Sequence, residues 1–74
     1  MKIEFQDAGV EAQLIITSTA FEYRKHNRAV NRVLSQIPKA YFVESGAFVL
    51  KTHIYGNAAD LYQAYLFVKK EMKL

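Results

Sequence analysis

Alternating hydrophobic and polar residues open the chain and predict a β-hairpin. The alternation covers residues 1–6, is interrupted around Gly9, and resumes over residues 11–17. A two-residue turn tip that ends at Gly9 places Phe5 opposite Ala12, so hydrophobic side chains share one face. The positions expected to face the core are Ile3, Phe5, Ala12, Leu14 and Ile16. The positions expected to face solvent are Lys2, Glu4, Gln6, Glu11, Gln13, Ile15 and Thr17.

Residues 19–38 continue with helical periodicity and predict the first helix. Thr19 can cap the first turn, Glu22 completes a capping box with it, and Pro38 ends the helix. The residues expected to face the core are Tyr23, Val30, Val33, Leu34 and Ile37. His26 lies at the edge of this face, and we expect it to be partly buried.

Residues 40–44 and 47–55 predict a second hairpin, joined at residues 45–46. A two-residue loop at this place pairs Val43 with Phe48. The face expected to enter the core carries Tyr41, Val43, Phe48, Leu50, Thr52 and Ile54. The outer face carries Phe42, Val49, Lys51, His53 and Tyr55. This outer face is more hydrophobic than that of the first hairpin.

Asn57 is a good N-cap, and it predicts a second helix from about Ala58 towards the C-terminus, with Asp60 in its first turn. Its core face is expected to carry Leu61, Ala64, Tyr65, Val68 and Met72. Further hydrophobic residues lie off that face, at Tyr62, Leu66 and Phe67. The pattern predicts a single α+β domain over residues 1–74, a two-layer ββαββα fold with a four-stranded antiparallel sheet and two helices on one face.

The composition excludes several classes of stabilising and catalytic site. The 74 residues include no cysteine, so a disulfide framework and a cysteine zinc site are excluded. There is no local histidine pair and no glycine-rich phosphate loop. We therefore expect a protein that is not an enzyme, with no cofactor and no metal. The alternative is a catalytic group assembled from distant residues, such as His53 with Glu44 or Asp60.

Positive charge is concentrated on the first predicted helix. The chain has a net charge of +3, and residues 21–40 hold five basic residues and one acidic residue, a balance of +4. A four-residue spacing places three arginines on one ridge, with a lysine and an asparagine beside them. This basic ridge consists of Arg24, Lys25, Arg28, Asn31 and Arg32. No acidic residue lies between Glu22 and Ile37 to neutralise it. The ridge is expected to bind an acidic partner, and the alternative is a solvated face that provides solubility.

The function expected from these features is a small regulatory binding protein of the inhibitor or adaptor type. It would engage an acidic protein surface through the basic ridge, as a homodimer. The alternative is a nucleic-acid-binding protein that contacts phosphates with the same arginines. The residues expected at a subunit or partner interface are Phe42, Val49, Tyr55, Tyr62, Leu66 and Phe67. On the outer sheet face, the alternative to such an interface is stacking of Phe42, His53 and Tyr55 on unpaired bases.

No signal peptide and no hydrophobic run of membrane-spanning length is visible, so we expect a cytoplasmic protein, or one that acts inside a host cell, without membrane association. A short chain without a catalytic motif is also typical of the stand-alone binding proteins of phages and mobile elements.

Overall fold

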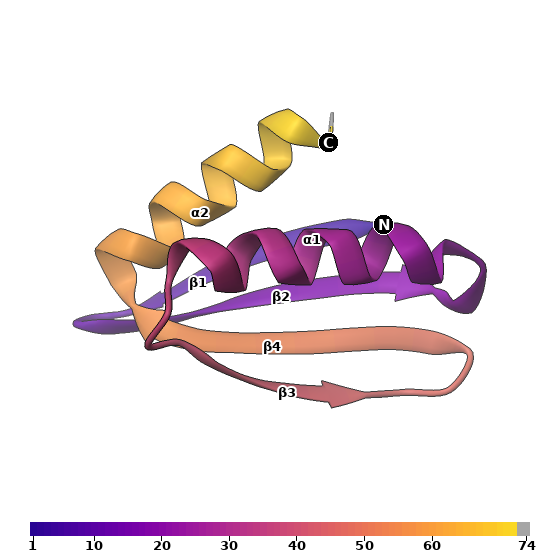
Figure 1. Cartoon of the computed structure of the whole chain (residues 1–74). Helices are drawn as coiled ribbons and strands as arrows, with labels where there is room; N and C mark the ends of the chain where they lie inside the picture. Colours follow the sequence, from indigo (N-terminus) through magenta and orange to yellow (C-terminus); the bar gives the residue numbers. More distant parts are fainter. Residues whose placement is uncertain (73–74) are drawn as a thin grey trace.

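Residues 1–72 are described by a computed structural model, which has four strands and two α-helices. The elements are β1 (Lys2–Ala8), β2 (Glu11–Thr19), the 3-10 turn η1 (Ala20–Glu22), α1 (Tyr23–Gln36), β3 (Tyr41–Ser45), β4 (Val49–Asn57) and α2 (Ala58–Glu71). The strands form one antiparallel sheet in the order β1-β2-β4-β3. Both helices cover the same face of this sheet (Figure 1). The α+β two-layer ββαββα fold is thereby confirmed. The second helix was also expected over residues 73–74, which lie outside the described part of the chain.

The hydrophobic core lies between the helices and the two central strands. It consists of Ala12, Leu14, Ile16, Ala29, Val30, Val33, Ile37, Ile54, Leu61, Ala64 and Val68. Burying the valine, leucine and isoleucine side chains of this core contributes about 1.5–3 kcal/mol each. The predicted core faces of β2 and of both helices supply nearly all of it.

Within residues 1–72, no helix has the length and hydrophobicity needed to cross a membrane.

The first hairpin has the predicted faces and a different register. Phe5 pairs with Leu14, not with Ala12, and Gly9 adopts a φ of 97° in the turn. The expected register was therefore wrong by two residues. Because side chains alternate with a period of two, this shift leaves the same residues facing the helices. Ile15 lies on the opposite face as expected, but it is buried, at 6% exposure, between Glu4 and His53 in neighbouring strands.

The second hairpin departs from the prediction in both register and facing. Val43 pairs with His53, not with Phe48, and Phe42 pairs with Ile54. Tyr41 and Val43 therefore lie on the face without helices, whereas Phe42 lies on the helix-covered side, the reverse of the expectation. The loop covers residues 46–48, and its Phe48 carbonyl accepts a hydrogen bond of 2.9 Å from the amide of Ala20.

The start of the first helix is also different from the prediction. The α-helix begins at Tyr23 after the turn η1, and no side chain caps it. Glu22 accepts hydrogen bonds of 3.2 Å from the Met1 ammonium and one of 3.5 Å from the Thr19 hydroxyl. The Thr19 side chain therefore caps no amide, and the capping box does not form. Tyr23 was expected in the core and is 59% exposed, because His26 and Ala29 occupy the buried face of this turn.

The second helix begins as predicted. The Asn57 side chain accepts hydrogen bonds from the amides of Ala59 and Asp60, at 2.9 and 3.4 Å. The Ala58 amide donates to the Val10 carbonyl at 2.9 Å. The turn of the first hairpin is thus hydrogen-bonded to the start of α2. The loop of the second hairpin is likewise hydrogen-bonded, through Phe48, to the start of η1.

β3 is the least covered part of the sheet. α1 packs on β2 and β4, and α2 packs on β1, β2 and β4, whereas the extensive contacts of β3 are with β4. All five residues of β3 are exposed. Figure 1 shows β3 at the edge of the sheet, beyond the area covered by the helices.

Candidate functional site

The basic ridge lies on the solvent side of α1. Arg24, Lys25, Arg28, Asn31 and Arg32 are all exposed. The opposite side of the helix buries His26, Ala29, Val30 and Val33 against the core. The core contacts of one side therefore fix the direction in which the other side presents its positive charge.

Arg32 differs from the rest of the ridge because it forms an ion pair. Its Nε atom lies 2.9 Å from Oε1 of Glu71 on α2. This contact links the two helices and partly neutralises the C-terminal end of the ridge. The pairing joins residues that are far apart in the sequence, so the charge spacing along α1 could not reveal it.

The remaining cations keep their charge available. Within the described residues, Arg24, Lys25 and Arg28 have no carboxylate within 4.0 Å. The nearest acidic residue in the sequence, Glu22, points its carboxylate to the Met1 ammonium, whose hydrogen bond lowers the pKa of Glu22. These three cations lie in the N-terminal half of α1, and Arg24 and Lys25 lie in its first turn, where the helix dipole disfavours positive charge.

Exposed aromatic residues lie next to this N-terminal half. Phe21 is completely exposed, and Tyr23 follows it at the first position of α1. The hydrogen bond between Ala20 and Phe48 brings the β3–β4 loop to the same place, and Phe48 is 88% exposed. We call Phe21, Tyr23 and Phe48 the aromatic tip. The hydrophobic pattern of the sequence does not predict this cluster, although Phe21 lies off the predicted core face.

The open face of the sheet carries a row of stacked rings and hydrogen-bonded amides. The Tyr41 and Tyr55 rings are stacked with centroids 5.1 Å apart, and His53 lies 6.3 Å from Tyr55. The Gln13 amide nitrogen donates to Gln6 at 2.7 Å, and its oxygen contacts His53 Nδ1 at 3.1 Å. Val49 and Tyr55 lie on this face as expected. Phe42 does not, and Tyr41 takes its place.

The hydrophobic residues of α2 outside its core face divide into two kinds. Tyr62 packs edge-on against Phe5 of β1, with ring centroids 5.3 Å apart, and thereby shields the end of the core. Leu66 and Phe67 are exposed without a comparable aromatic contact among the described residues. This part of α2 remains a candidate interface.

A buried hydrogen-bonded chain connects α1 with the two central strands. Nδ1 of His26 lies 2.7 Å from Ser18 Oγ, and Nε2 lies 2.6 Å from Thr52 Oγ1. A neutral imidazole donates through one nitrogen and accepts through the other, so the two hydroxyls have opposite roles. Burial lowers the pKa of His26 and favours this neutral form, while the nearby charge of Glu44 acts weakly in the opposite direction. His26 is therefore a buried structural residue, more deeply placed than the sequence predicted.

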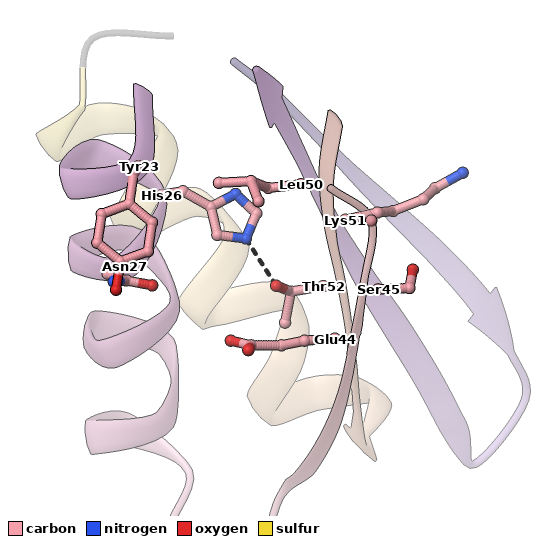
Figure 2. Close-up of a pocket in the computed structure, with 9 residues that line it drawn as sticks. Tyr23, His26, Asn27, Glu44, Ser45, Leu50, Lys51 and Thr52 are labelled. Atoms are coloured by element: carbon pink, nitrogen blue, oxygen red, sulfur yellow. Dashed lines mark hydrogen bonds between the residues drawn. The ribbon is translucent and has the colours of Figure 1, made fainter. Parts of the chain in front are cut away.

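A cavity of about 290 Å³ opens beside the hydrogen-bonded side chains of Ser18, His26 and Thr52, between α1 and the β3–β4 hairpin. Figure 2 shows the Glu44 side chain pointing towards α1, while Ser45 and Lys51 point away from it. Both ring nitrogens of His26 already have partners, and Ser18 is buried, so the group offers no accessible nucleophile and base. The alternative grouping of His53 with Glu44 is wrong, because the two residues lie on opposite faces of the sheet.

The described residues contain no group of three or more histidine, aspartate or glutamate side chains that could hold a metal ion. Comparisons of the chain with protein-family models, with curated proteins and with solved structures found no match.

Proposed function

We propose that this protein is a non-enzymatic binding protein that engages an acidic protein surface through the N-terminal half of the basic ridge. One observation carries this proposal: Arg24, Lys25 and Arg28 are exposed, and no carboxylate of residues 1–72 pairs with them. Arginine binds carboxylates in bidentate geometry, which suits recognition of such a surface. The protein would act as an inhibitor or adaptor.

The electrostatic cost of the arrangement supports a functional origin. Each cation in the first turn of a helix is disfavoured by about 0.3–1 kcal/mol, and Arg24 and Lys25 lie in this turn. Arg32 lies beyond the first turn, and it is the ridge residue that forms an ion pair within the described residues. Arg24 and Lys25 therefore gain most from an external carboxylate.

The aromatic tip favours a protein partner over a nucleic acid. Phe21, Tyr23 and Phe48 expose hydrophobic surface, and Phe21 and Tyr23 adjoin Arg24 and Lys25 in the sequence. A protein surface with acidic residues around a hydrophobic centre complements both features. A phosphate backbone would use the arginines alone, and the net charge of +3 is small for a nucleic-acid-binding protein.

A capture experiment with matched charge reversals tests the proposal. The tagged protein, Arg28→Glu and Lys70→Glu are each incubated with host lysate, with and without nuclease. Arg28 and Lys70 are both exposed on helices, and the two substitutions change the net charge equally. We expect a partner protein that survives nuclease treatment, that Lys70→Glu retains, and that Arg28→Glu binds about tenfold more weakly.

Two outcomes would contradict the proposal. Equal binding by all three proteins would show that the ridge is not the binding surface. Recovery that requires nucleic acid would support the phosphate-binding alternative. In that case, titration of a fluorescent oligonucleotide at several salt concentrations should give a log–log slope of about 0.7–0.9 per neutralised phosphate.

A further inference from the structure

We infer that β3 is a self-association edge. It pairs antiparallel with β3 of a second copy, around a two-fold axis at Phe42, and joins the two sheets into one of eight strands. This inference concerns a different surface from the basic ridge and does not rest on the proposed function.

The two edges of the sheet differ in their protection. In β1, charged residues occupy three of the seven positions, and Lys2 and Glu4 approach each other at 3.6 Å. In β3, Glu44 is the one charged residue among five, and Tyr41, Phe42 and Val43 are all exposed. An exposed hydrophobic edge strand with free backbone groups is a template for pairing with another strand. Charged residues and the packing of α2 restrict β1, whereas β3 is open.

Symmetry limits the register of such a pair. A two-fold axis perpendicular to the sheet places residues from the same face opposite one another, so the axis can pass through Phe42, Val43 or Glu44. An axis at Glu44 brings two carboxylates together, and an axis at Val43 places Phe42 opposite a carboxylate. An axis at Phe42 pairs the two Phe42 rings and places Tyr41 opposite Val43. This last register matches hydrophobic residues throughout the centre.

The charged residues at the two ends of the strand do not oppose pairing in this register. Residues 39–45 run from Lys39 through a hydrophobic centre to Glu44 and Ser45. Pairing about Phe42 places Ala40 of one copy opposite Glu44 of the other, and Lys39 opposite Ser45, so no charged residue lies opposite another of the same sign. No cation of the basic ridge belongs to this edge. Like-charge contacts, which would oppose association of a protein with net charge +3, are therefore avoided.

The dimer extends features that each subunit already has. On the open face, the stacked Tyr55 and Tyr41 would continue to Val43 and His53 of the second copy in one row. On the other face, the two Phe42 side chains would fill part of the area that the helices leave uncovered. Because the axis is perpendicular to the sheet, both copies of α1 lie on the same side. The assembly therefore presents two basic ridges to one partner surface.

Sedimentation of the full chain and two matched variants tests this inference. Phe42 and Phe67 are exposed to nearly the same extent, 46% and 43%, on β3 and α2. We expect a wild-type dimer between about 1 and 200 µM, a monomer for Phe42→Lys, and a dimer for Phe67→Lys. Circular dichroism establishes that both variants are folded. A monomeric wild type, or a dimer that persists in Phe42→Lys, would overturn the inference, and loss of the dimer in Phe67→Lys alone would place the interface on α2.

A cross-linking experiment tests the register independently of protein stability. The chain has no native cysteine, so Phe42→Cys introduces a single thiol. Directly opposite residues of antiparallel strands have Cβ atoms about 4.5–5.5 Å apart, close to the separation that a disulfide requires. We expect mild oxidation to give a covalent dimer with Phe42→Cys and little with Phe67→Cys. Equal cross-linking of the two variants, or none with Phe42→Cys, would contradict pairing about Phe42.

Discussion

The two hairpins have the same layout and different environments. The first, β1–β2, lies beneath α2 and the core, and most of its inward side chains are shielded. The second, β3–β4, buries Thr52 and Ile54 in its inner strand but leaves its outer strand exposed on both faces. The two helices lie over β1, β2 and β4, and the uncovered strand is β3, at the edge next to β4.

This difference shows that hydrophobicity alone does not decide burial in so small a protein. Tyr41, Phe42 and Val43 are as hydrophobic as many core residues, yet they stay about half exposed, because neither helix makes extensive contacts with β3. The same shortage of covering structure leaves the aromatic tip exposed. The surfaces assigned to binding are therefore the places where the chain has no residues left to cover its own hydrophobic groups.

The largest expected effect separates two residues that lie directly opposite each other. Ile54 is completely buried on β4, and its neighbour Phe42 is exposed on β3. Ile54→Ala should reduce the free energy of unfolding by about 2–5 kcal/mol, because it leaves a cavity. Phe42→Ala should reduce it by about 1 kcal/mol or less. Urea unfolding at equal low protein concentration measures both values, and similar losses would show that β3 is packed as tightly as β4.

The next effect concerns the polar chain that joins the two hairpins through His26. Substitution His26→Gln should cost about 1–3 kcal/mol, because hydroxyls of Ser18 and Thr52 lose partners. Burial lowers the native pKa of His26, so below about pH 6.5 the unfolded state binds a proton that the native state does not. Wild-type stability is therefore complete above this pH and declines as the pH falls towards the lower native pKa.

Thermal unfolding between about pH 7.5 and pH 5 checks the pH dependence, because the His26→Gln variant should lose less stability over this interval than the wild type. Glu22, whose pKa is also lowered, is retained in both proteins and titrates below its usual value of 4.5. Parallel pH profiles for the two proteins would show that His26 does not titrate differently in the folded and unfolded states.

A smaller effect compares the glycines of the two turns. Gly9 and Gly46 both have positive φ, at 97° and 107°. An added Cβ at Gly9 meets no atom within 4 Å, whereas at Gly46 it overlaps the Val49 carbonyl. Gly9→Ala should cost about 1–2 kcal/mol from backbone strain alone. Gly46→Ala should reduce the free energy of unfolding by more than this. It should also perturb the NMR signal of the Ala20 amide, which donates a hydrogen bond to the same loop. Equal losses for the two variants in chemical denaturation would contradict the loop geometry.

The smallest effect concerns the ion pair between the helices of the two halves. Glu71→Gln removes the partner of Arg32 and should change stability by about 0.5 kcal/mol or less, because the pair is partly exposed. It should also free one more cation of the ridge and tighten binding to an acidic partner at low salt. Titration of the captured partner against both proteins measures this gain, which should disappear at high salt. Unchanged affinity at low salt would place Arg32 outside the binding surface.

The sequence predicted the element order and the core of the first hairpin, because strict alternation determines which side chains share a face. The Asn57 cap was likewise evident, since its side chain acts on neighbouring amides. The second hairpin was not predictable in this way. Tyr41, Phe42 and Val43 are consecutive hydrophobic residues without alternation, so either facing fits the pattern. The direction in which these side chains face depends on the pairing of β4 with β2 and on the hydrogen bond from Ala20 to Phe48. Both of these are long-range contacts.

The candidate site was predictable only where it depends on the local spacing of residues. The four-residue spacing of the arginines identifies the ridge, because it depends on one helix. Two other features depend on segments far apart in the chain: the pairing of Arg32 with Glu71, and the position of Phe48 next to Phe21. Local sequence carries no information on such proximity.

The central position of the β2–β4 ladder has a consequence for how quickly the chain folds. Its closest paired residues along the chain, Thr19 and Val49, are separated by all of α1 and β3. Loop-closure entropy opposes such a contact until other interactions compensate for it, whereas each hairpin and helix forms from neighbouring residues. We therefore expect docking of the two halves through β2 and β4 to limit the folding rate. Substitutions in this ladder should then slow folding, and substitutions in β3 should chiefly accelerate unfolding.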